Sequence, residues 1–418
     1  MVEETPHIAP NLELRRRVLT RAGARSGEVE ELLTYNRSAI EQRGLPAFPT
    51  FPLSDEPHLE AWRAYAEEAP RHGAWAVLRD RIPQLRFPVA AGMSERGEYR
   101  DATRKGISPQ ENDPEACLRL AEPDGVELLL HPAIAGTVPI VAVTVRADFV
   151  SLVQALCHRN EPKQIPDSMG ACIVAGFNNW DRVRTYRRRW QASHPAADDD
   201  AWAQEFSRML PNKSAYQDRF IILSRGPYSN VQGAEVGFGE AEWLERSFFI
   251  RREHECTHYF TLRVFGALQH NLLEELIADF VGLVTAFGSF RTELALRFLG
   301  LDSFPTVRPT GRLQNYRGSP PLSEGAFAVL ARLAYDGVRN LGLCAADRPQ
   351  TLNSPVDLAR LVCALTTLTM EEVAADGVVN RVDSRLAMIF RKSQHSFPEG
   401  RDGSVAAASS PKVGNGKP

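Results

Sequence analysis

The sequence predicts an α+β protein that is predominantly helical. Apolar residues recur at the three-to-four spacing of helices over most of the chain. A few short runs between residues 126 and 224 instead have the length and composition of strands, and they alternate with helical patterns. The chain has 418 residues, of which 43% are apolar and 24% charged. It is therefore long enough for two or three domains and has the composition of a folded globular protein.

The first part of the chain is expected to be an α-rich region over residues 1–90. Apolar residues have helical spacing in residues 12–22, 28–42 and 60–80. Three prolines between residues 45 and 52 separate the second of these helices from the third. Residues 91–114 are polar and contain several glycines, so they are expected to form a long loop or a boundary.

The middle of the chain, residues 115–300, is expected to be an α+β domain. The strand-like runs are residues 126–130, 139–145, 171–177 and 220–224. Helical patterns cover residues 147–158, 179–191, 240–265 and 271–287. A loop with several glycines, residues 226–239, comes directly before the long helix that begins at residue 240.

The last part is expected to be a helical region over residues 301–395, followed by a disordered tail. Helical patterns are found in residues 322–338, 355–368 and 381–391. Residues 396–418 are mostly Gly, Ser, Ala, Pro and Lys and have almost no apolar bulk, which is typical of disorder.

Charge and cysteine content indicate a cytoplasmic protein without a nucleic-acid or membrane partner. The net charge of −3 offers no excess of basic residues for nucleic acid. The first 18 residues have no apolar core of a signal peptide, and the least charged stretch, residues 128–145, is interrupted by proline and glycine. Six cysteines are scattered without a close pair, which argues against a disulfide framework or a cysteine-based metal site. The oligomeric state is not indicated.

One segment carries chemistry: His254-Glu255-Cys256-Thr257-His258, an H-E-x-x-H pattern inside an expected helix. Residues four apart lie one turn apart on the same face, so both imidazoles can converge on one metal ion. Glu255 lies beside them, where it can accept a proton from water, and Cys256 is expected to be a small core residue. A catalytic zinc site needs a third protein ligand.

We expect the third ligand to be Glu275, on the next helix. Gly266 can end the first helix and Asn271 can cap the second. Glu275 and Asp279 are one turn apart in an otherwise apolar helix, and buried carboxylates require cations or hydrogen-bond donors. Glu274 is less suitable because it lies about 100° round the helix, with an alanine one turn beyond it, so we expect its removal to have little effect.

Together the two segments resemble the gluzincin metallopeptidases, the thermolysin- and neprilysin-like enzymes, whose pattern is H-E-x-x-H and then E-x-x-x-D on a following helix. The resemblance covers residues 254–279 only. It implies a zincin-like metal domain with two adjacent motif helices, flanked by the helical N- and C-terminal regions. It also implies that the Zn²⁺ ligands are His254, His258 and Glu275, that Glu255 is the general base and that Asp279 orients a ligand histidine.

Two further features of that family have no clear counterpart. The edge-strand motif Asn-Ala-aromatic is matched only loosely by Phe177-Asn178-Asn179-Trp180, which is farther upstream than expected, and Asn179 is expected to cap the following helix instead. The residue that stabilises the oxyanion is not assigned. The four candidates are Tyr216, Tyr228, His270 and Tyr316.

The patterns therefore favour a zinc-dependent hydrolase, with a metallopeptidase as the preferred activity. It would cleave peptide or protein substrates through a zinc-bound water activated by Glu255. Two alternatives stay open: a zinc-binding protein without turnover, and an interaction protein in which the H-E-C-T-H sequence is accidental. Metal analysis and a protease assay distinguish the three.

Overall fold

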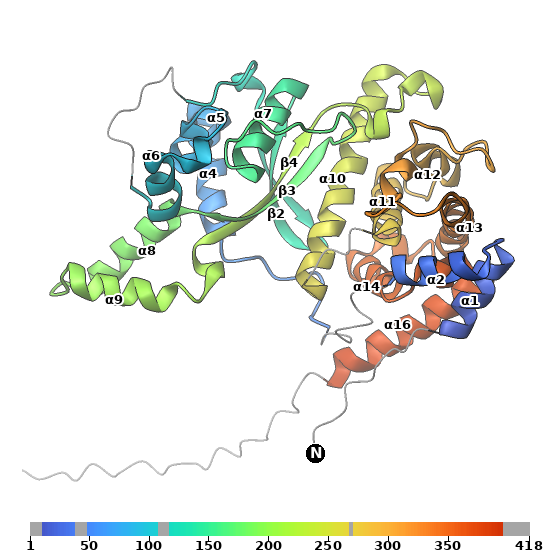
Figure 1. Ribbon diagram of the computed structural model, residues 1–418. Helices are drawn as coiled ribbons and strands as arrows, with labels where there is room; N and C mark the ends of the chain where they lie inside the picture. The colour runs from blue at the N-terminus through green and yellow to red at the C-terminus, as the bar shows by residue number, and fades with distance from the viewer. Residues whose placement is uncertain (1–10, 38–47, 108–116, 267–270, 396–418) are drawn as a thin grey trace, which may run out of the picture.

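The computed structural model describes residues 11–37, 48–107, 117–266 and 271–395. The described part is predominantly helical and contains one four-stranded sheet, so the predicted fold class is confirmed (Figure 1). No helix in these ranges is both long and apolar enough to cross a membrane.

The sheet has the strand order β1-β2-β4-β3. Its strands are β1 (Glu127–Ala133), β2 (Gly136–Val143), β3 (Ala171–Asn178) and β4 (Gln217–Ser224). β1 and β2 form an antiparallel hairpin, β2 and β4 are parallel, and β3 is antiparallel to β4. The two central strands are the most apolar, and β1 and β3 form the edges.

Alternate residues of the central strands contribute to two different cores, because side chains alternate between the faces of a sheet. One face, which includes Val141 and Ile222, packs with α4 (Leu59–His72), α5 (Ala74–Arg81) and α7 (Arg146–Cys157). The opposite face, which includes Ile140 and Ile221, belongs to a larger core that continues into α10 (Glu240–Phe265). α10 therefore lies between the sheet and the helical half of the molecule (Figure 1).

The helical half combines helices from the N-terminal part of the chain with helices from its C-terminal part. Its members are α1 (Leu12–Arg21), α2 (Ser26–Tyr35), α11 (Leu272–Phe287), α12 (Thr292–Leu299), α13 (Glu324–Asp347), α14 (Pro355–Thr366), α15 (Met370–Ala374) and α16 (Val378–His395). α1 and α2 pack on α13 and α15, as the blue helices beside the red ones show (Figure 1). Arg15 forms a buried ion pair of 3.0 Å with Glu371, to which Asn36 also donates. The first 90 residues thus divide between the two cores.

Several elements differ from the expectations. The helix expected over residues 60–80 is broken at Gly73, whose φ of 83° is unfavourable for other residues. The loop expected over residues 91–114 contains short helical turns up to Lys105. α9 (Asp199–Met209) and α12 were not predicted. Asn179 caps α8 (Trp180–Ser193), as expected. The predicted tail, residues 396–418, lies outside the described residues.

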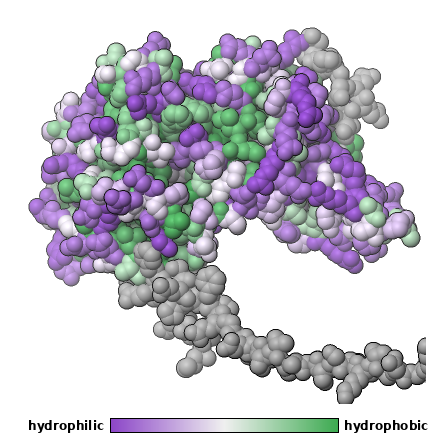
Figure 2. Space-filling model, turned by 180° about the vertical axis from the view of Figure 1, so that it is seen from behind, coloured by the Kyte–Doolittle hydropathy of each residue, from purple (hydrophilic) through white to green (hydrophobic). Residues whose placement is uncertain are grey.

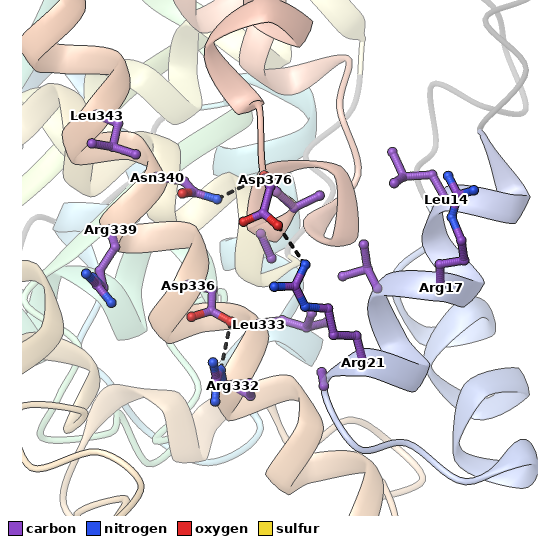
Figure 3. A pocket seen from close by; sticks show the side chains of 14 residues that line it. Leu14, Arg17, Arg21, Arg332, Leu333, Asp336, Arg339, Asn340, Leu343 and Asp376 are labelled. Atoms are coloured by element: carbon purple, nitrogen blue, oxygen red, sulfur yellow. Dashed lines mark hydrogen bonds and ion pairs between the residues drawn. The ribbon is translucent and has the colours of Figure 1, made fainter.

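The back of the molecule is mostly hydrophilic, with hydrophobic residues gathered near the middle of this face (Figure 2). A separate cavity of about 590 Å³ lies between α1 and α13 (Figure 3). Its lining includes Arg17, Arg21, Arg332 and Arg339, and Arg21 pairs with Asp376 across it. None of the residues predicted to bind metal lines this cavity.

Candidate metal centre

The candidate site is built on α10 and α11, whose bounds follow the sequence signals. α10 spans the predicted residues and ends at Gly266, which has the left-handed conformation that suits a helix C-terminus. Asn271 caps α11 by accepting from the backbone N–H of Glu274 at 2.9 Å. The two helices cross closely at Gly282, where a Cβ atom would lie 2.7 Å from the carbonyl oxygen of Ile250.

His254, His258 and Glu275 come together between these helices, as expected. The two imidazole Nε2 atoms are 3.0 Å apart. The carboxylate oxygens of Glu275 lie 3.5 Å from Nε2 of His254 and 3.4 Å from Nε2 of His258. Within the described ranges this is the one group of three His, Cys, Asp or Glu side chains arranged to hold a metal ion.

These separations fit a tetrahedral metal ion. Ligand atoms about 2.0–2.1 Å from a tetrahedral metal are about 3.3 Å from one another, close to the distances between the three side chains. Two imidazole nitrogens and a carboxylate oxygen are donors that suit zinc and related transition metals better than magnesium or calcium. The residues present therefore fit a transition-metal ion such as zinc, which His254, His258 and Glu275 would hold.

A second carboxylate lies behind each imidazole. Nδ1 of His254 is 2.9 Å from Asp279, as the sequence analysis expected. Nδ1 of His258 is 3.3 Å from Glu274, which also accepts from the hydroxyl of Thr261 at 2.9 Å. Each imidazole thus presents Nδ1 to a carboxylate and Nε2 to Glu275. In the neutral ring Nδ1–H donates to the carboxylate and Nε2 keeps its lone pair, whereas protonation adds an N–H that donates to Glu275.

The interpretation of Glu274 changes accordingly. The sequence predicts no role for Glu274, because an alanine lies one turn beyond it on α11. The structure buries Glu274, at 4% exposure, against His258. The available signal was its apolar surroundings: a carboxylate that cannot reach solvent needs a hydrogen-bond donor, and His258 and Thr261 are its donors.

Asp279 is the centre of a buried hydrogen-bond network. It accepts from the hydroxyl of Tyr228 at 2.6 Å and from the guanidinium of Arg312, and Arg312 also donates to Tyr228 at 2.9 Å. Burial raises the pKa of Asp279, but the charge of Arg312 and the hydrogen bond from His254 more than offset it, so the pKa lies below its usual value. Asp279 is therefore an ionised acceptor for His254.

Tyr228 is a buried member of this network. Its side chain is 4% exposed, and its hydroxyl is occupied by Asp279 and Arg312. Burial raises its pKa well above the ordinary value. Arg251 of α10 donates to the backbone carbonyls of Ser224, Gly226 and Pro227, and so fixes the segment that leads into Tyr228. Burial lowers the pKa of Arg251 to about 10.

The other oxyanion candidates differ in their positions. Tyr316 is partly buried beside Glu275, and burial followed by the charge of Glu275 raises its pKa. Tyr216 donates to the carbonyl of Leu210, in an exposed turn. His270 lies outside the described residues. Tyr316 is thus the tyrosine beside the Glu275 carboxylate.

The site attracts positive charge. Burial lowers the pKa of His254, yet its hydrogen bonds with Asp279 and Glu275 raise it above 6.5 overall. Burial likewise lowers the pKa of His258, and hydrogen bonds with Glu274 and Glu275 raise it well above 6.5. The pKa of Glu275 falls well below its usual value, because hydrogen bonds from both histidines outweigh burial. Protons or a metal ion would satisfy this excess of carboxylates.

Glu255 is placed differently from the other acids. Its side chain is partly exposed, and no hydrogen bond to it is formed within the part of the chain that the structure describes. Its charge acts on His258, on Arg251 of the same helix and on Cys172 of β3. Glu255 is therefore a partly exposed carboxylate within electrostatic range of a ligand histidine.

Comparison with known protein families matches residues 17–377 to DUF7005, which is described as a family of unknown function. The matched segment includes the sheet and every residue of the candidate site. No curated protein and no solved structure gives a match.

Proposed function

The chain belongs to DUF7005, a family of unknown function, and because that membership carries no activity we propose from its own residues that it is a zinc-dependent hydrolase. The proposed activity is that of a metallopeptidase of gluzincin type, with residues 115–300 as a zincin-like metal domain. The observation that carries the proposal is the convergence of His254, His258 and Glu275, with a carboxylate behind each imidazole.

The protonation pattern supports metal binding. When both imidazoles are neutral and each Nδ1 donates to a carboxylate, each Nε2 presents only a lone pair. Two such nitrogens 3.0 Å apart repel each other unless a proton or a metal ion lies between them. Zinc would satisfy both nitrogens and the carboxylate of Glu275 at once.

The proposed chemistry is hydrolysis of a peptide bond. The metal, when bound, supplies Lewis-acid polarisation of the scissile carbonyl and of the attacking water. Glu255 accepts a proton from that water and delivers it to the leaving amine, a role that suits a partly exposed carboxylate to which no hydrogen bond is donated within the described ranges. Asp279 and Glu274 keep the two imidazoles in the required tautomer.

Tyr316 is the proposed hydrogen-bond donor to the oxyanion. It is a neutral hydroxyl at neutral pH, as a tyrosine with a pKa of 10 or above always is, and it lies beside Glu275. Tyr228 does not fill this role, since it is buried and its hydroxyl is held between Asp279 and Arg312. Peptide or protein substrates are proposed from the gluzincin resemblance of the two motif segments.

A cytoplasmic location is part of the proposal. All six cysteines are free thiols, the state that a reducing compartment maintains.

The decisive experiment combines metal analysis with a peptidase assay. Protein purified without chelator should contain about one zinc per chain and should cleave members of a mixed peptide library, and Glu255→Gln should keep the zinc without cleaving. A folded protein with no transition metal would refute the proposal. Bound zinc without any hydrolysis by the wild type would favour the alternative of a zinc-binding protein without turnover.

A further inference from the structure

Cys157 and Cys172 lie in direct contact outside the candidate metal centre. Cys157 is the last residue of α7, and Cys172 is the second residue of β3. Their sulfur atoms are 3.2 Å apart. Fifteen positions separate the two residues in the sequence, so their spacing does not predict a contact. The packing of α7 on β3 brings the two sulfur atoms together. These two thiols therefore need little movement to form a bond.

The segment between the two cysteines is fixed to α7 by hydrogen bonds. Arg146, in the first turn of α7, donates to the carbonyls of Pro166 and Met169, just before β3. Gln154 donates to the carbonyl of Lys163 at 2.7 Å. These hydrogen bonds keep Cys157 and Cys172 close to each other without involving the sulfur atoms.

Exposure distinguishes these thiols from most of the others. Cys157 and Cys172 are both partly exposed, whereas Cys256, Cys344 and Cys363 are buried. A small reagent in solution can therefore reach the pair more readily than it can reach the buried thiols.

The two sulfurs are electrostatically unequal. The hydrogen bond from Cys172 lowers the pKa of Cys157. The same hydrogen bond, then burial and nearby charges that include Glu255, raise the pKa of Cys172. Either sulfur can donate in this contact, so each thiol can support the thiolate of the other, and we expect Cys157, whose pKa is lowered, to be the first nucleophile.

We propose that Cys157 and Cys172 are a reversible redox pair, oxidised to an intramolecular disulfide by small-molecule disulfides. The Cys157 thiolate attacks one sulfur of the oxidant R–S–S–R, forming a mixed disulfide and releasing one R–S⁻. Cys172 then loses its proton and attacks the Cys157 sulfur, which forms the Cys157–Cys172 bond and releases the second R–S⁻. Two protein thiols are oxidised, one disulfide is reduced to two thiols, and the two protons go to the released thiolates.

The inference is independent of zinc binding, because neither cysteine is a proposed ligand. It also adds a site next to the proposed general base, since the charge of Glu255 acts on Cys172. Cys157 and Cys172 belong to the core on the α7 face of the sheet, so the bridge would lie on the opposite face of β3 from α10.

The test is thiol counting on the full chain with oxidised glutathione as the probe. After incubation, the protein is denatured in iodoacetamide and analysed by mass spectrometry. Six modified cysteines are expected without the oxidant and four with it, together with a cross-linked peptide that contains Cys157 and Cys172. Dithiothreitol should restore all six. Six free thiols after oxidation, or a bridge between other cysteines, would overturn the proposal.

Single variants test the order of attack. Cys172→Ser should accumulate a glutathione adduct on Cys157, because the resolving thiol is missing, and Cys157→Ser should form an adduct on Cys172 several-fold more slowly. Cys117→Ser is the matched control, since Cys117 is also partly exposed, and it should still form the bridge. Faster adduct formation in Cys157→Ser than in Cys172→Ser would contradict the assignment of Cys157 as the nucleophile.

Discussion

At the scale of single residues, the candidate site is defined by what lies behind its ligands. Asp279 and Glu274 accept from Nδ1 of His254 and His258, one carboxylate for each imidazole. Asp279 is in turn held by Tyr228 and Arg312, which come from two short helical turns far from the motif in sequence. The ligands themselves follow a local pattern, whereas these supporting residues depend on tertiary packing.

The carboxylates behind the histidines should control zinc affinity. Glu275→Ala should remove most of the affinity because it removes a ligand. Asp279→Ala and Glu274→Ala should each weaken zinc binding or activity by about 10–100-fold, because the imidazole orientation is lost. Zinc titration against a competing chelator measures all three.

Glu245→Ala is the matched control for this series, since Glu245 is exposed on α10, and its zinc affinity should equal that of the wild type. Unchanged affinity in Glu274→Ala would show that the contact with His258 is incidental.

Glu255→Gln should retain zinc and stability while losing hydrolysis. The amide has nearly the same shape as the carboxylate but cannot accept a proton. Elemental analysis, thermal unfolding and kcat on the substrate of the wild type should be measured on the same preparation. Turnover close to that of the wild type would exclude Glu255 as the general base.

Zinc should stabilise the protein more as the pH rises. The pKa values of His254 and His258 are raised above 6.5 in the folded, metal-free protein. Their charged interactions therefore stabilise that form fully below about pH 6.5 and are lost as the pH rises through the raised values. Zinc requires the neutral imidazoles, so its affinity increases over the same range.

The measurement is the difference in Tm with and without zinc, taken from about pH 6 to about pH 8. It should grow with pH. A difference that is constant or falls with pH would mean that zinc does not compete with protons on these histidines.

At the scale of elements, local signals predicted the pieces that carry the ligands. The spacing of apolar residues and the capping residues Gly266 and Asn271 gave α10 and α11 correctly. The sequence did not reveal the Cys157–Cys172 contact or the role of Glu274, because both depend on how elements pack. Nor did it predict that α1 and α2 pack with the C-terminal helices, since hydrophobic periodicity identifies a buried face but not its partner.

The crossing of α10 and α11 should be sensitive to one added methyl group. Gly282→Ala places a Cβ atom 2.7 Å from the carbonyl oxygen of Ile250, so the helices must move apart. We expect a loss of about 1–3 kcal/mol in the free energy of unfolding, and weaker zinc binding because the ligands lie on both helices.

Urea denaturation and zinc titration check this prediction. Gly27→Ala in α2 is the control, because no atom lies within 4 Å of an added Cβ there, and it should be neutral or slightly stabilising. Equal stability of the Gly282→Ala and Gly27→Ala variants would contradict close packing at Gly282.

At the scale of the whole molecule, the buried ion pair between Arg15 of α1 and Glu371 of α15 joins the N-terminal helices to the C-terminal helices. Their side chains are 3% and 0% exposed. Glu371→Gln removes the carboxylate charge that faces the buried guanidinium of Arg15 and should cost about 3–5 kcal/mol of the free energy of unfolding. Asp376→Asn breaks the exposed pair with Arg21 and should change stability by about 1 kcal/mol or less. Urea denaturation of both variants tests the contrast, and similar losses would be inconsistent with burial as the cause.

The packing of α1 and α2 on helices from the C-terminal part of the chain has a consequence for biosynthesis. α1 and α2 leave the ribosome long before the helices on which they pack, since α2 packs on α13, which begins at Glu324, and α1 packs on α15, which follows it. At about 5–20 residues per second, the intervening segment of nearly 290 residues takes about 15–60 s to synthesise. During that interval the core side chains Leu19 and Leu32 lack their final neighbours. A nascent chain stalled before α13 should therefore recruit chaperones to its first 35 residues, and the released full-length protein should not.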